Sequence, residues 1–310
     1  MRTFARVVEA GSFAAAASQL GISRAQASKL VYRLEEHLGA RLLQRTTRHL
    51  HLTETGRSYY NRIITVLSDI DEAEAETSQQ QTEPRGRLRI SAPVTFTPHH
   101  LVPALAEFLK SHPRIELELE LTDRRVELID EGYDLAIRIG QLQDSSLIAR
   151  QLAPVHSYVL AAPSYLHRNG EPERPEDLEQ HLCLPYTLSH EPAVWRFRHN
   201  GQHVSIRIRG PVHTNHGGAL LTFIEQGLGI GMLPDFICEQ ALREGRLRTL
   251  LDKWEPQLIG IHIVYPSRRA LPARTRTLID FLGKQFEKKC QIVKQKRHRK
   301  NTTVDTNPHR

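Results

Sequence analysis

Cysteine is scarce in this chain, since its 310 residues include only Cys183, Cys238 and Cys290. The three cysteines are far apart and form no C-x-x-C pair, so the sequence offers neither a disulfide framework nor a clustered zinc site. Isolated thiols are typical of proteins kept in a reducing compartment. We therefore predict a cytoplasmic protein without a metal site.

Long apolar runs are also missing. No stretch of about 18 consecutive apolar residues occurs, which is the length that a membrane-spanning helix requires. The alanine-rich start resembles a signal peptide only faintly, because Arg6 and Glu9 interrupt its apolar core. Neither membrane insertion nor secretion is expected.

Charge is distributed unevenly, although the total is only +7. Residues 1–62 hold ten basic and four acidic side chains, a net charge of +6, and residues 284–310 hold nine and two, a net charge of +7. Residues 63–283 hold 23 and 29, a net charge of −6. Because a polyanion is attracted to basic segments, the two ends indicate nucleic acid as a partner.

The N-terminal region predicts a helix-turn-helix. Three short helices are expected over residues 2–10, 12–20 and 23–38. Ser12 and Ser23 are natural N-caps for the second and third helices, Gly21 allows a tight turn between them, and Gly39 ends the third. Two helices joined by such a turn are typical of DNA-binding proteins.

A basic hairpin and a long helix follow. Leu50 and Leu52 alternate with histidines after a turn that contains Arg45 and Arg48, so residues 40–53 are expected to form a wing. The next helix, from Thr53 to about residue 80, has apolar residues spaced three and four apart, as in a dimerising seam. These residues are Tyr60, Ile63, Ile64, Leu67 and Ile70.

From Leu88 onward, strands alternate with helices, which predicts an α/β fold with a mixed or parallel sheet. Two successive sets of strands and helices, followed by a last helix near residues 275–289, indicate two lobes around a cleft. Residues 291–310 are polar and basic and show no core-forming periodicity. We predict that this tail is disordered.

The third helix and the wing carry side chains suited to DNA. Arginine pairs with guanine edges, serine with several bases, and the alanine methyl group with thymine. Guanidinium groups at the tip of a hairpin can clamp phosphates or enter the minor groove. The residues expected to contact DNA are Ser23, Arg24, Ala25, Ser28, Lys29, Arg33, Arg45 and Arg48.

Several motifs resemble those of a single family. The first 57 residues contain GSFAAAASQLGIS, LEEHLGARLLQRTTR and LTETG, and the body contains LRISAPVTF, EGYDLAIRIG and GLGIGMLPDF. In this combination they are similar to the LysR-type transcriptional regulators, over about residues 1–290. The basic tail has no counterpart in the family's pattern.

The resemblance implies an organisation and a function. Residues 1–57 would form a winged helix-turn-helix, residues 58–86 a long linker and dimerisation helix, and residues 87–290 a two-lobed, periplasmic-binding-protein-like α/β effector domain, before the tail of residues 291–310. The implied protein is a transcriptional regulator, not an enzyme. It would need no cofactor, and it would bind double-stranded operator DNA with paired half-sites as a homodimer or homotetramer.

The resemblance also implies a small-molecule effector between the lobes. Strand-to-helix junctions near residues 93–96 and 214–215 would leave free N–H groups that suit an anionic or aromatic-acid molecule. The residues expected to contact the effector are Pro93, Val94, Thr95, Phe96, Thr214 and Asn215. Each of them is equally consistent with an ordinary helix cap.

Two other classes of function remain open from the residues alone. The first is a cytoplasmic enzyme or solute-binding protein with an incidental basic head, but such a protein has no need for a basic hairpin between two helices. The second is a nucleoid protein that binds DNA without sequence preference. A large two-lobed body argues against that interpretation.

Overall fold

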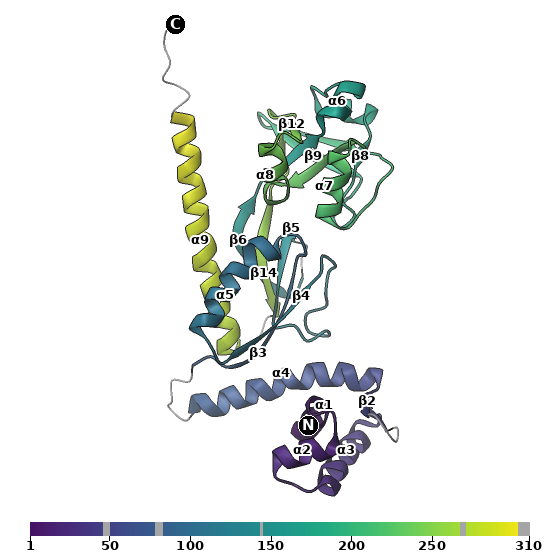
Figure 1. Cartoon of the computed structure of the whole chain (residues 1–310), viewed down its shortest axis with the longest axis vertical. Helices are drawn as coiled ribbons and strands as arrows, with labels where there is room; N and C mark the ends of the chain where they lie inside the picture. The colour runs from purple at the N-terminus through teal and green to yellow at the C-terminus, as the bar shows by residue number, and fades with distance from the viewer. Residues whose placement is uncertain (46–49, 78–82, 143–144, 267–270, 303–310) are drawn as a thin grey trace.

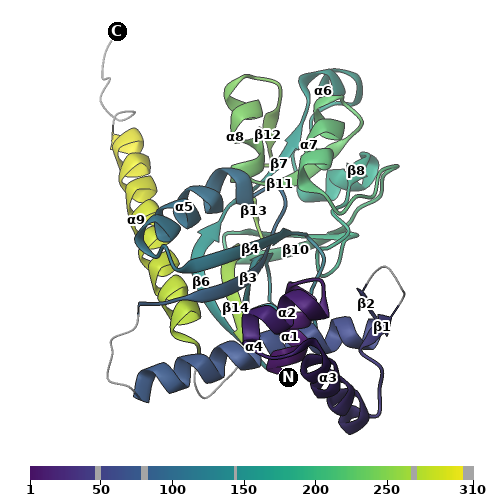
Figure 2. The ribbon, with the colours of Figure 1, turned by 60° about the horizontal axis from the view of Figure 1, so that its bottom comes forward.

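The computed structural model describes residues 1–45, 50–77, 83–142, 145–266 and 271–302 (Figure 1). A small helical domain at the N-terminus is followed by the long helix α4 and by a two-lobed α/β body. Figure 2 shows the N-terminal helices gathered against one part of α4. None of the helices in the described ranges has both the length and the apolar character needed to cross a bilayer.

The three predicted N-terminal helices are present as α1 (Arg2–Glu9), α2 (Phe13–Leu20) and α3 (Arg24–Leu38). The hydroxyl groups of Ser12 and Ser23 accept backbone N–H bonds of 3.1 Å at the starts of α2 and α3. Gly21 and Gly39 end these helices with φ values of +64° and +61°, where glycine meets no steric penalty. The predicted caps and stops are confirmed.

The predicted wing is a hairpin of β1 (Leu43–Arg45) and β2 (Leu50–Leu52), paired antiparallel. Arg45 is the last residue of β1 and lies opposite Leu50. The turn over residues 46–49, which includes Arg48, lies outside the described residues. The two strands of the wing are therefore confirmed.

Glu35 attaches the wing to α3. Its Oε1 atom accepts the backbone N–H of Leu42 at 2.8 Å and that of Leu43 at 3.0 Å. Both donors are partly buried, so they depend on this carboxylate rather than on water. One side chain near the end of α3 thus positions the start of the hairpin.

Replacing Glu35 with alanine should loosen this attachment. Hydrogen bonds to a charged group contribute about 1.5–3 kcal/mol each, so we expect the free energy of unfolding of the N-terminal domain to fall by about 2 kcal/mol or more. Urea unfolding followed by circular dichroism measures the change. The matched control is Glu36→Ala, an exposed neighbour that should change stability by less than about 0.5 kcal/mol. Equal losses at the two positions would contradict this role of Glu35.

Helix α4 (Glu54–Thr77) begins where the sequence predicts. The Thr53 hydroxyl accepts the N–H of Gly56 at 2.8 Å and donates to the carbonyl oxygen of Arg41 at 2.8 Å. The backbone N–H of Thr53 also donates to the Leu42 carbonyl at 3.0 Å. The start of α4 is therefore tied to the segment that enters the wing.

The apolar stripe of α4 mainly packs on the N-terminal domain of its own chain. Ile63 is only 4% exposed and belongs to the core around Phe4. Three more residues pack against the same core: Tyr60, Ile64 and Leu67. The prediction of one dimer seam made of all five apolar residues is therefore wrong. Among the α4 side chains whose exposure the structure describes, the large apolar ones that are exposed are Val66 at 48% and Ile70 at 41%, one turn apart.

Lobe I is a five-stranded mixed sheet with the strand order β4-β3-β5-β14-β6. Its strands are β3 (Gly86–Ala92), β4 (Ile115–Leu121), β5 (Leu135–Gly140), β6 (Leu147–Val155) and β14 (Ile259–Pro266). Strand β3 runs parallel to β4 and β5, whereas the pairs made by β14 are antiparallel. The helical segments η1 (Thr97–Leu101), α5 (Val102–Ser111) and α9 (Ala273–Thr302) complete the lobe. Residues of α5 and α9 share one apolar core with the sheet.

Lobe II contains a four-stranded sheet and a three-stranded sheet. The first has the order β12 (Arg248–Leu250), β7 (Ser157–Ala161), β11 (Ile230–Pro234) and β8 (Cys183–Leu184). The second has the order β10 (Gln202–Arg207), β9 (Val194–His199) and β13 (Glu255–Pro256). The helical segments are α6 (Pro163–Asn169), η2 (Pro175–Gln180), α7 (Gly217–Glu225) and α8 (Asp235–Arg243).

The chain passes between the lobes twice. It leaves lobe I after β6 and enters lobe II through His156, and it returns to β14 through residues 257–258. At this place β14 pairs with β6, with Ile259 opposite Val155. Lobe II is therefore one continuous segment, whereas lobe I is assembled from two.

Helix α9 continues through the basic segment, so the prediction of a disordered tail from Gln291 is wrong as far as Thr302. The start of α9 is anchored by Arg274, which is 2% exposed and pairs with Asp134 at 3.5 Å. A helix nucleated by such contacts elongates readily through lysine, glutamine and arginine, which have high helix propensity. Residues 303–310 lie outside the described residues.

Cys183 and Cys238 are fully buried free thiols, and burial raises the pKa of each to about 12. Because the thiolate is the reactive form, neither should be alkylated by iodoacetamide at about pH 8 while the protein is folded. Both should react in urea, as peptide mass spectrometry would show. An exposed thiol introduced by Ser145→Cys is the positive control. Labelling of Cys183 at the rate of that control would refute the prediction.

Candidate nucleic-acid interface and interlobe cleft

Helix α3 has one buried stripe and one open face. Ala27, Val31 and Leu34 are buried against the N-terminal domain at helical spacing. The opposite side is exposed and carries Ala25, Lys29 and Arg33. The capped helix α3 is thus a rigid element that exposes three of the predicted DNA-contacting side chains on one face.

The other predicted contacts on α3 lie at its start and along its edge. Ser23 and Arg24 are exposed at the N-terminus, where free N–H groups and the helix dipole favour a phosphate. The Ser23 hydroxyl already serves as the cap. Ser28 is half-buried beside the open face.

Two further side chains of this surface, Gln26 and Tyr32, were missed by the sequence reasoning. Both are exposed, Tyr32 at 55%. Glutamine can bind an adenine edge with both its donor and its acceptor. A helical projection centred on the buried Val31 would have included both, because they lie away from the buried stripe.

A cleft of about 760 Å³ is lined by both lobes. Lobe I contributes the ends of β3 and β5, and lobe II contributes β9, β11 and the start of α7. Most of the lining is apolar and includes Trp195, Phe236 and Val264. An apolar cavity with a few polar groups is typical of a small-molecule site.

At the first predicted junction, Pro93, Thr95 and Phe96 line the cleft. Val94 is not a lining residue, and its N–H donates to Asp123 Oδ1 at 3.0 Å. The Thr95 hydroxyl oxygen is buried and has no hydrogen-bond partner among the described residues. A buried hydroxyl without a partner costs about 1–3 kcal/mol, which a ligand with a polar atom would recover.

At the second junction the structure supports the helix-cap interpretation. The Thr214 hydroxyl accepts the N–H of His216 at 3.2 Å, and neither Thr214 nor Asn215 lines the cleft. Helix α7 begins after His216, whose Nδ1 accepts the N–H of Ala219 at 3.0 Å. Gly217, at the first turn of α7, lines the cleft instead.

The sequence reasoning also missed most polar residues of the cleft, and three of them bear on its chemistry. Arg138 extends from β5, Asp123 follows β4, and Tyr186 follows β8. Burial raises the pKa of Tyr186, and the negative charge of Asp123 raises it further. The phenol therefore remains protonated at neutral pH and can donate a hydrogen bond.

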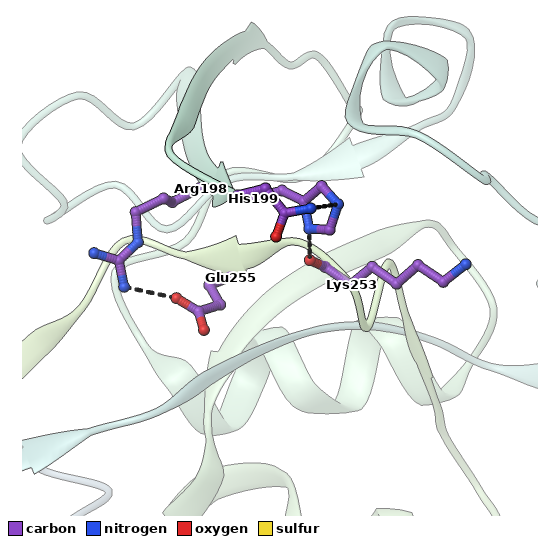
Figure 3. Close-up of a pocket in the computed structure, with 5 residues that line it drawn as sticks. Arg198, His199, Lys253 and Glu255 are labelled. Carbon is purple, nitrogen blue, oxygen red and sulfur yellow. Dashed lines mark hydrogen bonds and ion pairs between the residues drawn. The ribbon is translucent and has the colours of Figure 1, made fainter.

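A second, smaller pocket of about 360 Å³ lies on lobe II beside the β9–β10 hairpin. Figure 3 shows Arg198 pointing toward Glu255 while the side chain of Lys253 extends away from both. Arg198 donates to Glu255 at 2.7 Å, a bond that lowers the pKa of that carboxyl group. The ring of His199 donates through Nδ1 to the Lys253 carbonyl at 2.7 Å. The polar groups of this pocket thus pair mainly with one another.

Comparison with known families assigns both halves of the chain. Residues 1–57 match the model of the bacterial regulatory helix-turn-helix protein, LysR family. Residues 81–287 match the model of the LysR substrate binding domain. Together the two matches span both the N-terminal domain and the cleft-bearing body.

Individual relatives agree with this assignment. An HTH-type transcriptional regulator of Haemophilus influenzae is 42% identical over 271 residues, which cover 87% of this chain and 94% of the relative. The solved structure of CrgA, a LysR-type transcriptional regulator from Neisseria meningitidis, is 35% identical with a TM-score of 0.57, covering 92% of this chain and 97% of that one. The full-length structure of AphB from Vibrio cholerae is 30% identical with a TM-score of 0.56, covering 91% of this chain and 96% of the AphB chain. The chain therefore belongs to the LysR family of transcriptional regulators, which are DNA-binding proteins with an effector domain and not enzymes.

Proposed function

We propose that the open face of α3 reads the operator in the major groove and that the wing contacts the flanking backbone. The observation that carries this proposal is the capped α3 helix, whose buried stripe leaves Lys29 and Arg33 exposed side by side. The net charge of +6 on residues 1–62 supplies the attraction to DNA. The proposed contacts are Ser23, Arg24, Ala25, Gln26, Ser28, Lys29, Tyr32 and Arg33 on α3, with Arg45 and Arg48 in the wing.

The proposed division of labour follows the fold. Residues 1–57 bind DNA, residues 58–86 link and dimerise, and residues 87–290 sense the effector in the cytoplasm. Two heads joined through α4 would read paired half-sites, so operator symmetry would mirror the symmetry of the homo-oligomer. The exposed pair of Val66 and Ile70 supports this interface, because these large apolar side chains are left uncovered on the described part of α4.

The effector is proposed to bind in the interlobe cleft. Pro93, Thr95 and Phe96 would contact it from lobe I, and Gly217 would contact it from lobe II. The unpartnered Thr95 hydroxyl supports this placement. A ligand that touches both lobes would favour one angle between them and thereby bias the spacing of the two DNA-binding heads.

Selection of bound sequences from a random duplex library by the purified full chain tests the DNA-binding half. We expect enrichment of a motif with two related half-sites, and we expect Arg33→Ala and Lys29→Ala to weaken its enrichment. A library that stays random after selection would favour the nucleoid-protein alternative. Thermal-shift screening of a metabolite library, followed by operator titrations with each hit, tests the effector half.

The wing contact should also show in the salt dependence of binding. Each phosphate contact contributes about one unit to the slope of log affinity against log salt concentration, so Arg48→Ala should lower that slope by about one. The matched control is Arg243→Ala, an exposed arginine on α8 that should leave the slope unchanged. Titrations at several salt concentrations measure both variants. Equal slopes for the wild type and Arg48→Ala would refute the wing contact.

A further inference from the structure

Arg138 lies within β5, near the carboxyl end of the strand, and lines the cleft. Strand β5 runs parallel to β3, with Ser91 opposite Ala136, so Arg138 lies beside the segment that leads to Thr95. Its guanidinium donates to Ser91 Oγ at 2.9 Å and to the Ile137 carbonyl at 2.8 Å. Because Ser91 is fully buried, its hydroxyl has a fixed position, and its hydrogen bond orients the guanidinium.

No carboxylate within the described ranges forms an ion pair or a hydrogen bond with Arg138. Burial lowers the pKa of the guanidinium, whereas the charge of Asp123 raises it. Asp123 is itself engaged by the N–H of Val94. Burying a cation without a carboxylate partner costs folding free energy, and buried charges in proteins are usually paired.

The rest of the cleft suits an anion with an apolar body. A guanidinium has five N–H donors, of which Arg138 uses two within the protein, so enough remain for a two-point contact with a carboxylate. The Thr95 hydroxyl lines the same cleft and also lacks a partner among the described residues. Around these polar groups the walls are apolar and include Leu128, Trp195 and Phe236.

Charge in the cleft differs from charge in the surrounding body. Residues 63–283 have a net charge of −6, yet the cleft lining contains three arginines and two carboxylates. One of these arginines, Arg196, is already paired with Glu191. The remaining carboxylate, Asp123, would repel a multiply charged ligand, so a single negative charge fits best.

We propose that the effector is a monocarboxylic acid with an aromatic or branched aliphatic body, and that Arg138 and Thr95 bind its carboxylate. This inference rests on the proposed function of the cleft as the effector site. It adds the chemical class of the ligand and the residue that discriminates an acid from its neutral isostere. The apolar walls of the cleft would contact the apolar part of the ligand, while the guanidinium would supply the positive charge that the acidic lobes lack.

Matched pairs of acids and amides test the proposal on the full chain. The probes are benzoate, phenylacetate and 4-methylvalerate, each compared with its primary amide by saturation-transfer NMR and by thermal shift. At least one acid should bind, and its amide should bind about thirtyfold more weakly or not detectably. Arg138→Gln should weaken the acid to a similar extent, and Thr95→Val should weaken it less. Arg243→Gln is the control and should bind as the wild type does.

A stability measurement separates ligand binding from a structural role. Without ligand, Arg138→Gln should melt at the same temperature as the wild type or higher, because it removes a poorly compensated charge. A lower melting temperature together with unchanged discrimination between acid and amide would overturn the proposal. So would amides that bind as well as acids, or the failure of every acid to bind with a Kd below about 10 mM. An acid that binds through Arg138 but leaves operator affinity and bending unchanged would instead refute the proposed effector function.

Discussion

Val66→Asp should convert the protein to a monomer and weaken specific operator binding by about 100-fold or more. Val66 is 48% exposed on α4, one turn before Ile70, and the rest of the apolar stripe is engaged with the N-terminal domain. A carboxylate buried in a helix-helix interface without a partner would cost several kcal/mol. Once the two heads are separated, each binds its half-site alone, and the gain from linked binding, about 10²–10⁴, is lost.

Light scattering at micromolar concentration measures the oligomeric state, and fluorescence anisotropy with a complete operator measures affinity. The matched control is Leu182→Asp, at a residue of lobe II that is 49% exposed. This control should remain oligomeric with normal affinity. An oligomeric Val66→Asp protein would show that the exposed face of α4 is not the interface.

Gly56→Ala should unfold the N-terminal domain or nearly so, and should abolish operator binding. A β-carbon at this position would lie 2.0 Å from the Leu42 carbonyl oxygen and 2.8 Å from its carbon. That carbonyl also accepts the N–H of Thr53 and cannot retreat, because Leu42 is fully buried. Helix propensity alone predicts the opposite result, since alanine is favoured over glycine by about 1 kcal/mol within a helix.

We expect the clash to prevail and the free energy of unfolding to fall by about 3 kcal/mol or more, a large part of the stability of so small a domain. Thermal unfolding of the full chain, followed by circular dichroism, provides the measurement. Gly11→Ala is the control, because it has a φ of +66° and open space around it and should cost only about 1 kcal/mol. Similar losses at both sites would show that the close approach of α4 to Leu42 does not decide the effect.

The N-terminal domain was predictable because its signals are local. A serine cap acts within three residues, and a glycine stop acts at its own position, so Ser12, Ser23, Gly21 and Gly39 could be assigned without knowledge of the fold. The strands of the wing followed from alternation over a few residues. The alternating strands and helices of the body likewise predicted its mixed sheet and two lobes.

Features that depend on distant segments were not predictable in the same way. The spacing of Ile63 and Leu67 identifies an apolar face of α4 but does not say whether that face meets its own domain or a second chain. The composition after Gln291 suggested disorder, yet the anchored start of α9 supports a longer helix. In both cases the deciding contact lies far away in the sequence.

The cleft shows most clearly that contacts between distant segments are not predictable from local sequence. In the motif EGYDLAIRIG, Arg138 occupies a strand position with no local sign of a role. Its place in the cleft depends on the pairing of β5 with β3, which brings it beside Ser91, 47 positions earlier. Thr95, which was predicted to contact the effector, lines the cleft, whereas Thr214 serves as a local cap. Junctions between strands and helices predict where free N–H groups occur but not which of them face the other lobe.

The double passage between the lobes determines the order in which the nascent protein can fold. Among the described strands, β6 pairs with β14 alone, which lies between β5 and β6 in the sheet and is synthesised after the whole of lobe II. Lobe II is one continuous segment, so its sheets can form while it emerges from the ribosome. The sheet of lobe I, begun by the earlier residues 83–155, stays incomplete until β14 is made. The half of the body that is made first is therefore completed last. A ribosome that stalls before Ile259 leaves lobe I with unpaired strand edges, which are the surfaces on which nascent chains aggregate.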